Sequence, residues 1–98
     1  MLTLEQFKNA RSVLQGVLRP TPLIHSPYLS KSCGNNVYLK PENMQVTGAY
    51  KIRGAYYKIS TLSEEEKSRG LVTASAGNHA QGVAYAAQHA GVPATIVM

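Results

Sequence analysis

The second half of the chain alternates between strand and helix patterns, and this alternation limits the folds open to it. Two apolar segments, 71–74 and 93–98, are typical of buried strands. Between them lie the polar loop 75–79 and then a helix pattern. Gly91 is suited to end that helix, and Pro93 prevents its continuation. Strands joined through a helix pair in parallel with a right-handed crossover. The sequence therefore predicts an α/β fold built on a parallel sheet.

The helix predicted after this loop presents small side chains on its inner face. They recur at helical spacing as Ala80, Val83, Ala84 and Ala87. Small side chains let a helix lie close against a sheet or a cofactor, so we expect this helix to be tightly packed.

The loop 75–79 has the position and the donors of a ligand site. In an open parallel sheet, ligands bind beyond the carboxyl ends of the strands, where the next helices begin. The backbone N–H groups there are expected to be unpaired and to suit a carboxylate or a phosphate. Side-chain donors are added by Ser75, Asn78, His79 and Gln81. A plain polar turn, with Asn78 favouring a left-handed conformation, explains the same residues.

A second helix is predicted to begin near Lys51. One face of it carries the apolar side chains Ile52, Ala55, Tyr56 and Ile59. Thr47 is the expected N-cap residue, and Gly48 lets the backbone bend just before the helix. Lys51 then falls in the first turn, where the helix dipole disfavours a cation. A neutral amine is the form that attacks a carbonyl group and makes a Schiff base. The alternative is an ordinary solvated lysine.

The remaining segments are expected to support these two. An amphipathic helix is predicted over about residues 4–16, with a capping box formed by Thr3 and Gln6. Residues 27–33 form a short helix and residues 37–40 a short strand in this prediction. A second capping box, at residues 63–66, starts a short acidic helix.

Composition narrows the class of protein. The net charge is +5, but the ten basic residues are scattered along the chain and no zinc-finger or RRM pattern occurs, so nucleic-acid binding is not expected. No apolar run approaches the ~20 residues that span a bilayer, and no signal peptide is present, so we expect no membrane partner and a cytoplasmic location. The lone Cys33 fits a reducing compartment and is expected to be structural.

Other functional motifs are missing. His79 and His89 lack the spacing of metal ligands, so no metal site is predicted. No G-x-G-x-x-G or P-loop motif occurs, and Ser75 is not in a G-x-S-x-G elbow.

Taken together, the stretches GAYKIRGA, which contains Lys51, and SAGNHAQG resemble the threonine dehydratase (threonine ammonia-lyase) family. These are pyridoxal-phosphate enzymes of the tryptophan-synthase-β fold type, also called fold type II. The segments RPTPL and VYLKPENMQVTGAYK are similar to that family as well. The family usually has a Ser-Phe pair before its lysine, where this chain has Ala49 and Tyr50.

The resemblance implies a fold and an incomplete site. It implies a three-layer, open parallel sheet with flanking helices, of which the chain is the N-terminal portion. Residues 1–45 would be a lead-in segment, and residues 46–98 would begin the smaller βαβ subdomain. The family's glycine-rich phosphate loop lies downstream of residue 98. The chain is therefore expected to be inactive by itself.

The resemblance also implies a role for each matching residue. Lys51 would carry pyridoxal 5'-phosphate as a Schiff base and remove the substrate's α-proton, and Asn78 would hydrogen-bond the cofactor's 3′-oxygen. Tyr50 would pack near the cofactor ring. The substrate carboxylate would be bound by the loop residues Ser75, Ala76, Gly77, Asn78 and His79.

The implied reaction converts L-threonine, and also L-serine, to a 2-oxo acid and ammonia in a longer enzyme that forms dimers or tetramers. Two alternatives stay open. One is a serine racemase, or another β-eliminating enzyme, on the same scaffold. The other is a non-catalytic basic module, which salt-sensitive binding to DNA or RNA would reveal.

Overall fold

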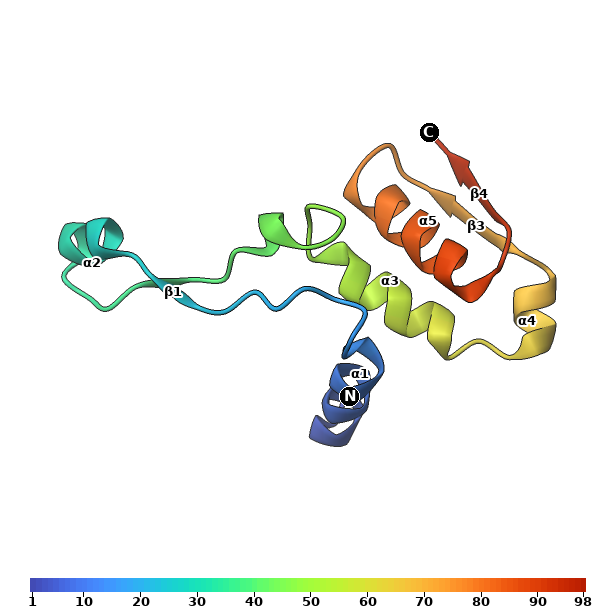
Figure 1. Cartoon of the computed structure of the whole chain (residues 1–98), viewed down its shortest axis with the longest axis horizontal. Helices are drawn as coiled ribbons and strands as arrows, with labels where there is room; N and C mark the ends of the chain where they lie inside the picture. The colour runs from blue at the N-terminus through green and yellow to red at the C-terminus, as the bar shows by residue number, and fades with distance from the viewer.

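The computed structural model describes residues 1–98 and mixes short strands with helices (Figure 1). The helices are α1 (Leu4–Leu14), α2 (Pro27–Cys33), α3 (Lys51–Ser60), α4 (Glu64–Ser68) and α5 (Asn78–Ala90), with a 3-10 turn, η1, at Glu42–Met44. The strands are β1 (Ile24–His25), β2 (Tyr38–Leu39), β3 (Leu71–Ala74) and β4 (Ala94–Val97). No helix has both the length and the apolar character needed to cross a bilayer.

The predicted βαβ unit is confirmed. β3 and β4 pair in parallel, from Leu71 opposite Ala94 to Ala74 opposite Val97, and α5 connects them. Gly91 ends α5 in the left-handed conformation, with φ of 66°. α5 lies between the two strands and α3, and α3 runs in the same direction as α5 (Figure 1). Both helix starts therefore lie at the same end of the unit.

The core lies between α3 and α5. Ile52 is fully buried, and its helix also buries Ala55 and Ile59, as the apolar spacing predicted. On α5 the buried residues are Ala80, Gly82, Val83, Ala86 and Ala87. The prediction was wrong for Ala84, which is exposed, and it left out Gly82 and Ala86. The reason is that α5 packs against α3 as well as against the strands, so its buried face is turned and widened.

The strands are less buried than their sequences suggested. Side chains alternate between half-buried and exposed along β3, and Val72 is 78% exposed. On β4 only Ile96 is half-buried. The prediction of buried strands is wrong for this structure because α5 covers one face of a two-stranded sheet and nothing covers the other.

Residues 24–39 extend away from this unit as an arm (Figure 1). β1 and β2 pair antiparallel at its base, and α2 forms its tip. Ser26 caps the start of α2, and Gly34, with φ of 69°, ends it. The predicted short helix is thus confirmed, and the predicted strand is shortened to two residues. Cys33 is a free, exposed thiol, so it does not serve the core as a structural cysteine would.

The two predicted capping boxes form. Thr3 and Gln6 exchange hydrogen bonds at the start of α1, and Ser63 and Glu66 do so at the start of α4. α1 lies against α3, where Asn9 donates a hydrogen bond of 3.1 Å to the Tyr57 hydroxyl. This contact ties the first helix to the helix that begins with Lys51.

Candidate active site

Lys51 is the first residue of α3 and lies in its first turn, as predicted. Gly48 has φ of 70°, so the expected bend before the helix also forms. The prediction that Thr47 caps the helix is wrong. The cap position is Tyr50, and the Thr47 hydroxyl lies 3.5 Å from the carbonyl oxygen of Ala49. The chain still turns between residues 47 and 50, which delays the helix by three residues.

The Lys51 side chain is exposed and takes part in no ion pair. α3 begins without a side-chain cap, so its first N–H groups also lack partners of that kind. A primary amine thus stands at a helix start with no competing contact.

The start of α5 lies directly beside the start of α3. A Cβ atom added at Gly82 would lie 3.3 Å from the Ile52 nitrogen and 3.4 Å from the Lys51 carbonyl carbon. Asn78 precedes Gly82 by four residues, so it lies on the same side of α5, one turn closer to the helix start. The predicted cofactor residues Lys51 and Asn78 therefore belong to neighbouring helix starts.

The loop 75–79 leaves most of its N–H groups free. The Ser75 N–H donates to the Val97 carbonyl at 2.9 Å, which extends the strand pairing by one residue. The Gly77 N–H donates to Ser75 Oγ at 3.3 Å, so this one group is paired inside the loop rather than free. No side chain caps α5. The N–H groups of its first turn, which begins at Asn78, therefore remain available to an anion.

The other predicted residues are accessible. Ala76, Gly77 and Asn78 are exposed, and Ser75 and His79 are half-buried. Tyr50 is 62% exposed, and its ring is in none of the aromatic pairs of the molecule. No group of three or more His, Cys, Asp or Glu side chains is arranged to hold a metal ion.

One polar cluster, between α3 and the segments before it, was not anticipated. Arg53 donates to both carboxylate oxygens of Glu42, from Nε and from Nη2, at 2.8 Å each. Thr21 is only 4% exposed, and its hydroxyl donates a hydrogen bond to Glu42 Oε1. The Arg53 guanidinium, assisted by this hydroxyl, lowers the pKa of Glu42 to about 2. The sequence held one signal, a glutamate and an arginine on either side of the lysine, but no local pattern pairs them.

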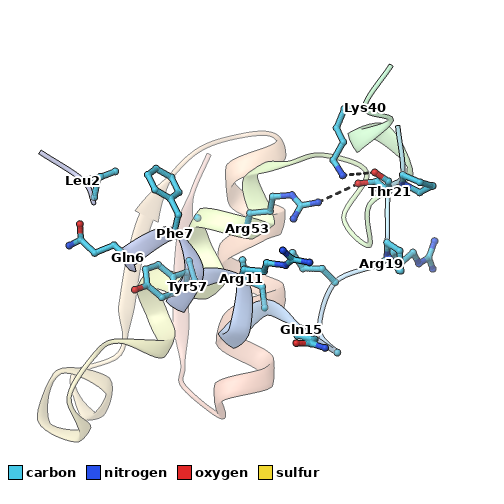
Figure 2. A pocket seen from close by; sticks show the side chains of 17 residues that line it. Leu2, Gln6, Phe7, Arg11, Gln15, Arg19, Thr21, Lys40, Arg53 and Tyr57 are labelled. Atoms are coloured by element: carbon cyan, nitrogen blue, oxygen red, sulfur yellow. Dashed lines mark hydrogen bonds between the residues drawn. The ribbon is translucent and has the colours of Figure 1, made fainter. Parts of the chain in front are cut away.

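A groove of about 910 Å³ lies between α1, the segment after it and the outer face of α3, and neither Lys51 nor the loop 75–79 lines it. Four of the ten basic side chains lie along it, although they are scattered in sequence: Arg11, Arg19, Lys40 and Arg53 (Figure 2). The candidate site is thus an open surface between two helix starts.

Known proteins resemble the chain over its whole length. It is 60% identical to the L-threonine ammonia-lyase of Thermotoga maritima, over all of this chain and 24% of that protein. The threonine deaminase of T.th. superposes with a TM-score of 0.86 at 42% identity, over 99% of this chain and 34% of that one. The serine racemase from Dictyostelium discoideum superposes with a TM-score of 0.91 at 37% identity, over 97% of this chain and 31% of that one.

These matches identify the fold class as the predicted one, with the chain as an N-terminal part of it. The chain spans about a quarter of the length of the curated relatives it matches (24% in the first case). Residues 14–98 match the family described as "Pyridoxal-phosphate dependent enzyme". Since this match covers most of the sequence, the chain belongs to the family of pyridoxal-phosphate dependent enzymes.

Proposed function

We propose that the longer protein to which this chain corresponds dehydrates and deaminates L-threonine and L-serine to a 2-oxo acid and ammonia, using pyridoxal 5'-phosphate. The observation that carries the proposal is the packing of the Lys51–Ile52 backbone against Gly82, which brings a reactive amine beside a free helix start. Relatives at 50–60% identity named as threonine ammonia-lyase or threonine dehydratase support the reaction and the substrate class.

The residues present fit the cofactor. An aldehyde needs an amine that is free of ion pairs, and Lys51 offers one. The absence of a side chain at Gly82 lets the two helix starts approach, so that the Asn78 amide lies within the same region as a donor. Since this chain spans only about a quarter of its relatives (24%), we propose that it binds the cofactor weakly and is inactive alone.

The predicted cofactor residues then have distinct roles. The bound cofactor supplies an electron sink for the negative charge formed at the substrate's α-carbon. Lys51 would hold the cofactor covalently, and its amine would accept the proton lost from the substrate's α-carbon. Asn78 would donate a hydrogen bond to the cofactor's 3′-oxygen, and Tyr50 would lie beside the ring.

The loop 75–79 binds the substrate carboxylate. Its free N–H groups and the dipole of α5 attract the anion, and the half-buried Ser75 and His79 add side-chain donors in the same loop. A carboxylate held there fixes the direction of the α C–H bond relative to the Lys51 amine. Positioning of this kind is the loop's contribution to the rate.

The test uses the full-length protein. Incubation with pyridoxal 5'-phosphate should give an absorbance band near the visible edge together with ammonia release from threonine. The variant Lys51→Ala should lose both. Lys58→Ala is the matched control, because Lys58 is exposed on the same helix, away from its start, and should keep both. An unchanged band in Lys51→Ala would refute the proposal.

A racemase activity is the second candidate, favoured by the structural match. The serine racemases of maize and Dictyostelium discoideum superpose with TM-scores of 0.89 and 0.91, against 0.86 for the threonine deaminase. The enzyme should be offered threonine, L-serine and D-serine, and the products separated by chirality. Accumulation of D-serine from L-serine would favour the racemase, and a 2-oxo acid alone would favour the dehydratase.

We also propose that the longer protein is a cytoplasmic homo-oligomer, a dimer or a tetramer, with amino acids rather than nucleic acids or membranes as its partners. The resemblance to threonine dehydratases and the lone cysteine support this. Light scattering after gel filtration measures the oligomeric state directly.

A further inference from the structure

We propose that the Glu42–Arg53 pair is a positioning device that sets the direction of the Lys51 amine. This inference rests on the function proposed above. The lysine loop, residues 42–53, begins at Glu42 and ends at Arg53, two residues beyond Lys51. The pair joins the two ends of the lysine loop by two hydrogen bonds of 2.8 Å. The loop is therefore closed on itself just beyond the reactive residue.

The geometry of the pair makes it a stiff joint. Two parallel N–H···O bonds between a planar guanidinium and a carboxylate fix both distance and orientation. The side chains are 37% exposed for Arg53 and 17% for Glu42, so water competes little for the carboxylate. The pair of Glu65 on α4 with Arg69, the residue that follows this helix, differs because it has one bond of 3.1 Å and side chains 83% and 68% exposed. Exposed pairs of this kind fix little.

A third segment holds the joint from outside. Thr21 donates its hydroxyl to Glu42 Oε1 and accepts from Arg53 Nη2 at 3.3 Å. Lys40 donates to the carbonyl oxygen of Thr21, and Figure 2 shows Lys40 and Arg53 reaching Thr21 from two sides. The pair is therefore anchored to the chain segment before the arm as well as to both ends of the lysine loop.

The interior of the lysine loop is fixed too. Gln45 is 3% exposed, and its amide accepts from the Arg19 N–H at 2.9 Å and donates to the Arg19 carbonyl at 3.1 Å. The side-chain oxygen of Gln45 also accepts a hydrogen bond from the Val46 N–H at 3.0 Å. Ala49, inside the loop, is 7% exposed. The backbone leading to Lys51 therefore has defined contacts at several points.

These contacts determine how α3 is rotated about its axis. Ile52 is fixed by burial against α5, and Arg53, the next residue around the helix, is fixed by Glu42. Because Ile52 and Arg53 are held on different sides of the helix, the first turn of α3 can adopt only one rotation about the helix axis. Without the joint, a first turn that has no side-chain cap is free to fray, and the Lys51 amine loses its direction.

The test measures cofactor capture as well as turnover in the full-length protein. The variants are Glu42→Gln, which removes the charge but keeps the shape, and Arg53→Lys, which keeps the charge but removes the two-bond geometry. Glu65→Gln is the matched control. Stopped-flow absorbance gives the rate at which the apoprotein captures pyridoxal 5'-phosphate, and steady-state kinetics give kcat and KM for threonine.

We expect Glu42→Gln and Arg53→Lys to slow cofactor capture and to lower kcat by about tenfold or more, with KM changed little, because misplacement of about 1 Å costs up to about a hundredfold in rate. Glu65→Gln should match the wild type. Capture and kcat at wild-type values in both variants, with only a lower melting temperature, would overturn the proposal. If Glu42→Gln does not fold, Arg53→Lys alone decides between these results.

The proposed function fails separately. If the wild-type band persists in Lys51→Ala, the lysine is not the attachment point and the function falls. If that band is lost in Lys51→Ala but forms at the wild-type rate in both Glu42→Gln and Arg53→Lys, the proposed function stands and the positioning role is wrong.

Discussion

Gly82 on α5 packs against the backbone of Ile52 on α3, so closely that a Cβ at position 82 would lie 3.3 Å from the Ile52 nitrogen and 3.4 Å from its Cα. Few real Cβ contacts are this short, and the neighbour is backbone, which yields little. The two helix starts are adjacent because position 82 has no side chain.

Gly82→Ala should therefore destabilise the protein although alanine is the better helix former. The helix gains about 1 kcal/mol from alanine, and overpacking costs about 1–3 kcal/mol. Gly54→Ala is the control, because Gly54 lies inside α3 with nothing within 4 Å of its added Cβ, and it should stabilise. Thermal midpoints of both variants measure the difference. A higher midpoint for Gly82→Ala than for Gly54→Ala would contradict the packing described.

Ile52 should be the most sensitive apolar position of the α3–α5 contact. It is the largest fully buried side chain, and Ile52→Ala should cost about 2–5 kcal/mol, whereas Ile52→Val should cost about 0.5–1.5 kcal/mol. Denaturant unfolding of the two variants gives these values. Equal, small losses in both would show that the core is not centred there.

The Glu42–Arg53 pair should make stability depend on acid. The pKa of Glu42 is lowered from 4.5 to about 2 in the folded protein, chiefly by Arg53, so its contribution is complete above about pH 4.5 and is lost as pH falls toward 2. The melting-temperature gap between wild type and Glu42→Gln should narrow over that range. The exposed pair mutated in Glu65→Gln should give a small gap at every pH. A gap for Glu42→Gln that is constant down to pH 2 would contradict the assignment.

Ser75 should act on the substrate rather than on the cofactor. Its Oγ holds the Gly77 N–H, and losing one such bond, worth about 1 kcal/mol, should raise KM for threonine about fivefold in Ser75→Ala with little change in cofactor capture. Ser60→Ala also removes one local side-chain hydrogen bond, at the end of α3, and should leave KM unchanged. A wild-type KM in Ser75→Ala would contradict the role of the loop 75–79 in binding the substrate carboxylate.

Local signals in the sequence predicted most of the fold. The capping boxes at Thr3 and Ser63 and the left-handed Gly91 each depend on residues close in sequence. The parallel pairing of 71–74 with 94–97 was predicted because a single helix with short connections joins the two strands. Thr47 failed as a cap because the turn at Gly48 continues to residue 50, and a propensity does not show where a turn stops.

Long-range packing could not be predicted in the same way. The approach of Gly82 to Ile52 spans thirty residues, and the joining of Glu42 to Arg53 depends on a turn between them. The paired motifs around Lys51 and the loop 75–79 pointed to one site through resemblance. Their neighbouring positions in space follow from the parallel packing of α3 and α5.

The most direct test of the account is to find which lysine carries the cofactor. The full-length protein is incubated with pyridoxal 5'-phosphate, reduced with borohydride, digested, and mapped by mass spectrometry. The account predicts a pyridoxyl group on Lys51 and on no other lysine of residues 1–98. A label on Lys58 or Lys40 in its place, or no label at Lys51, would contradict it.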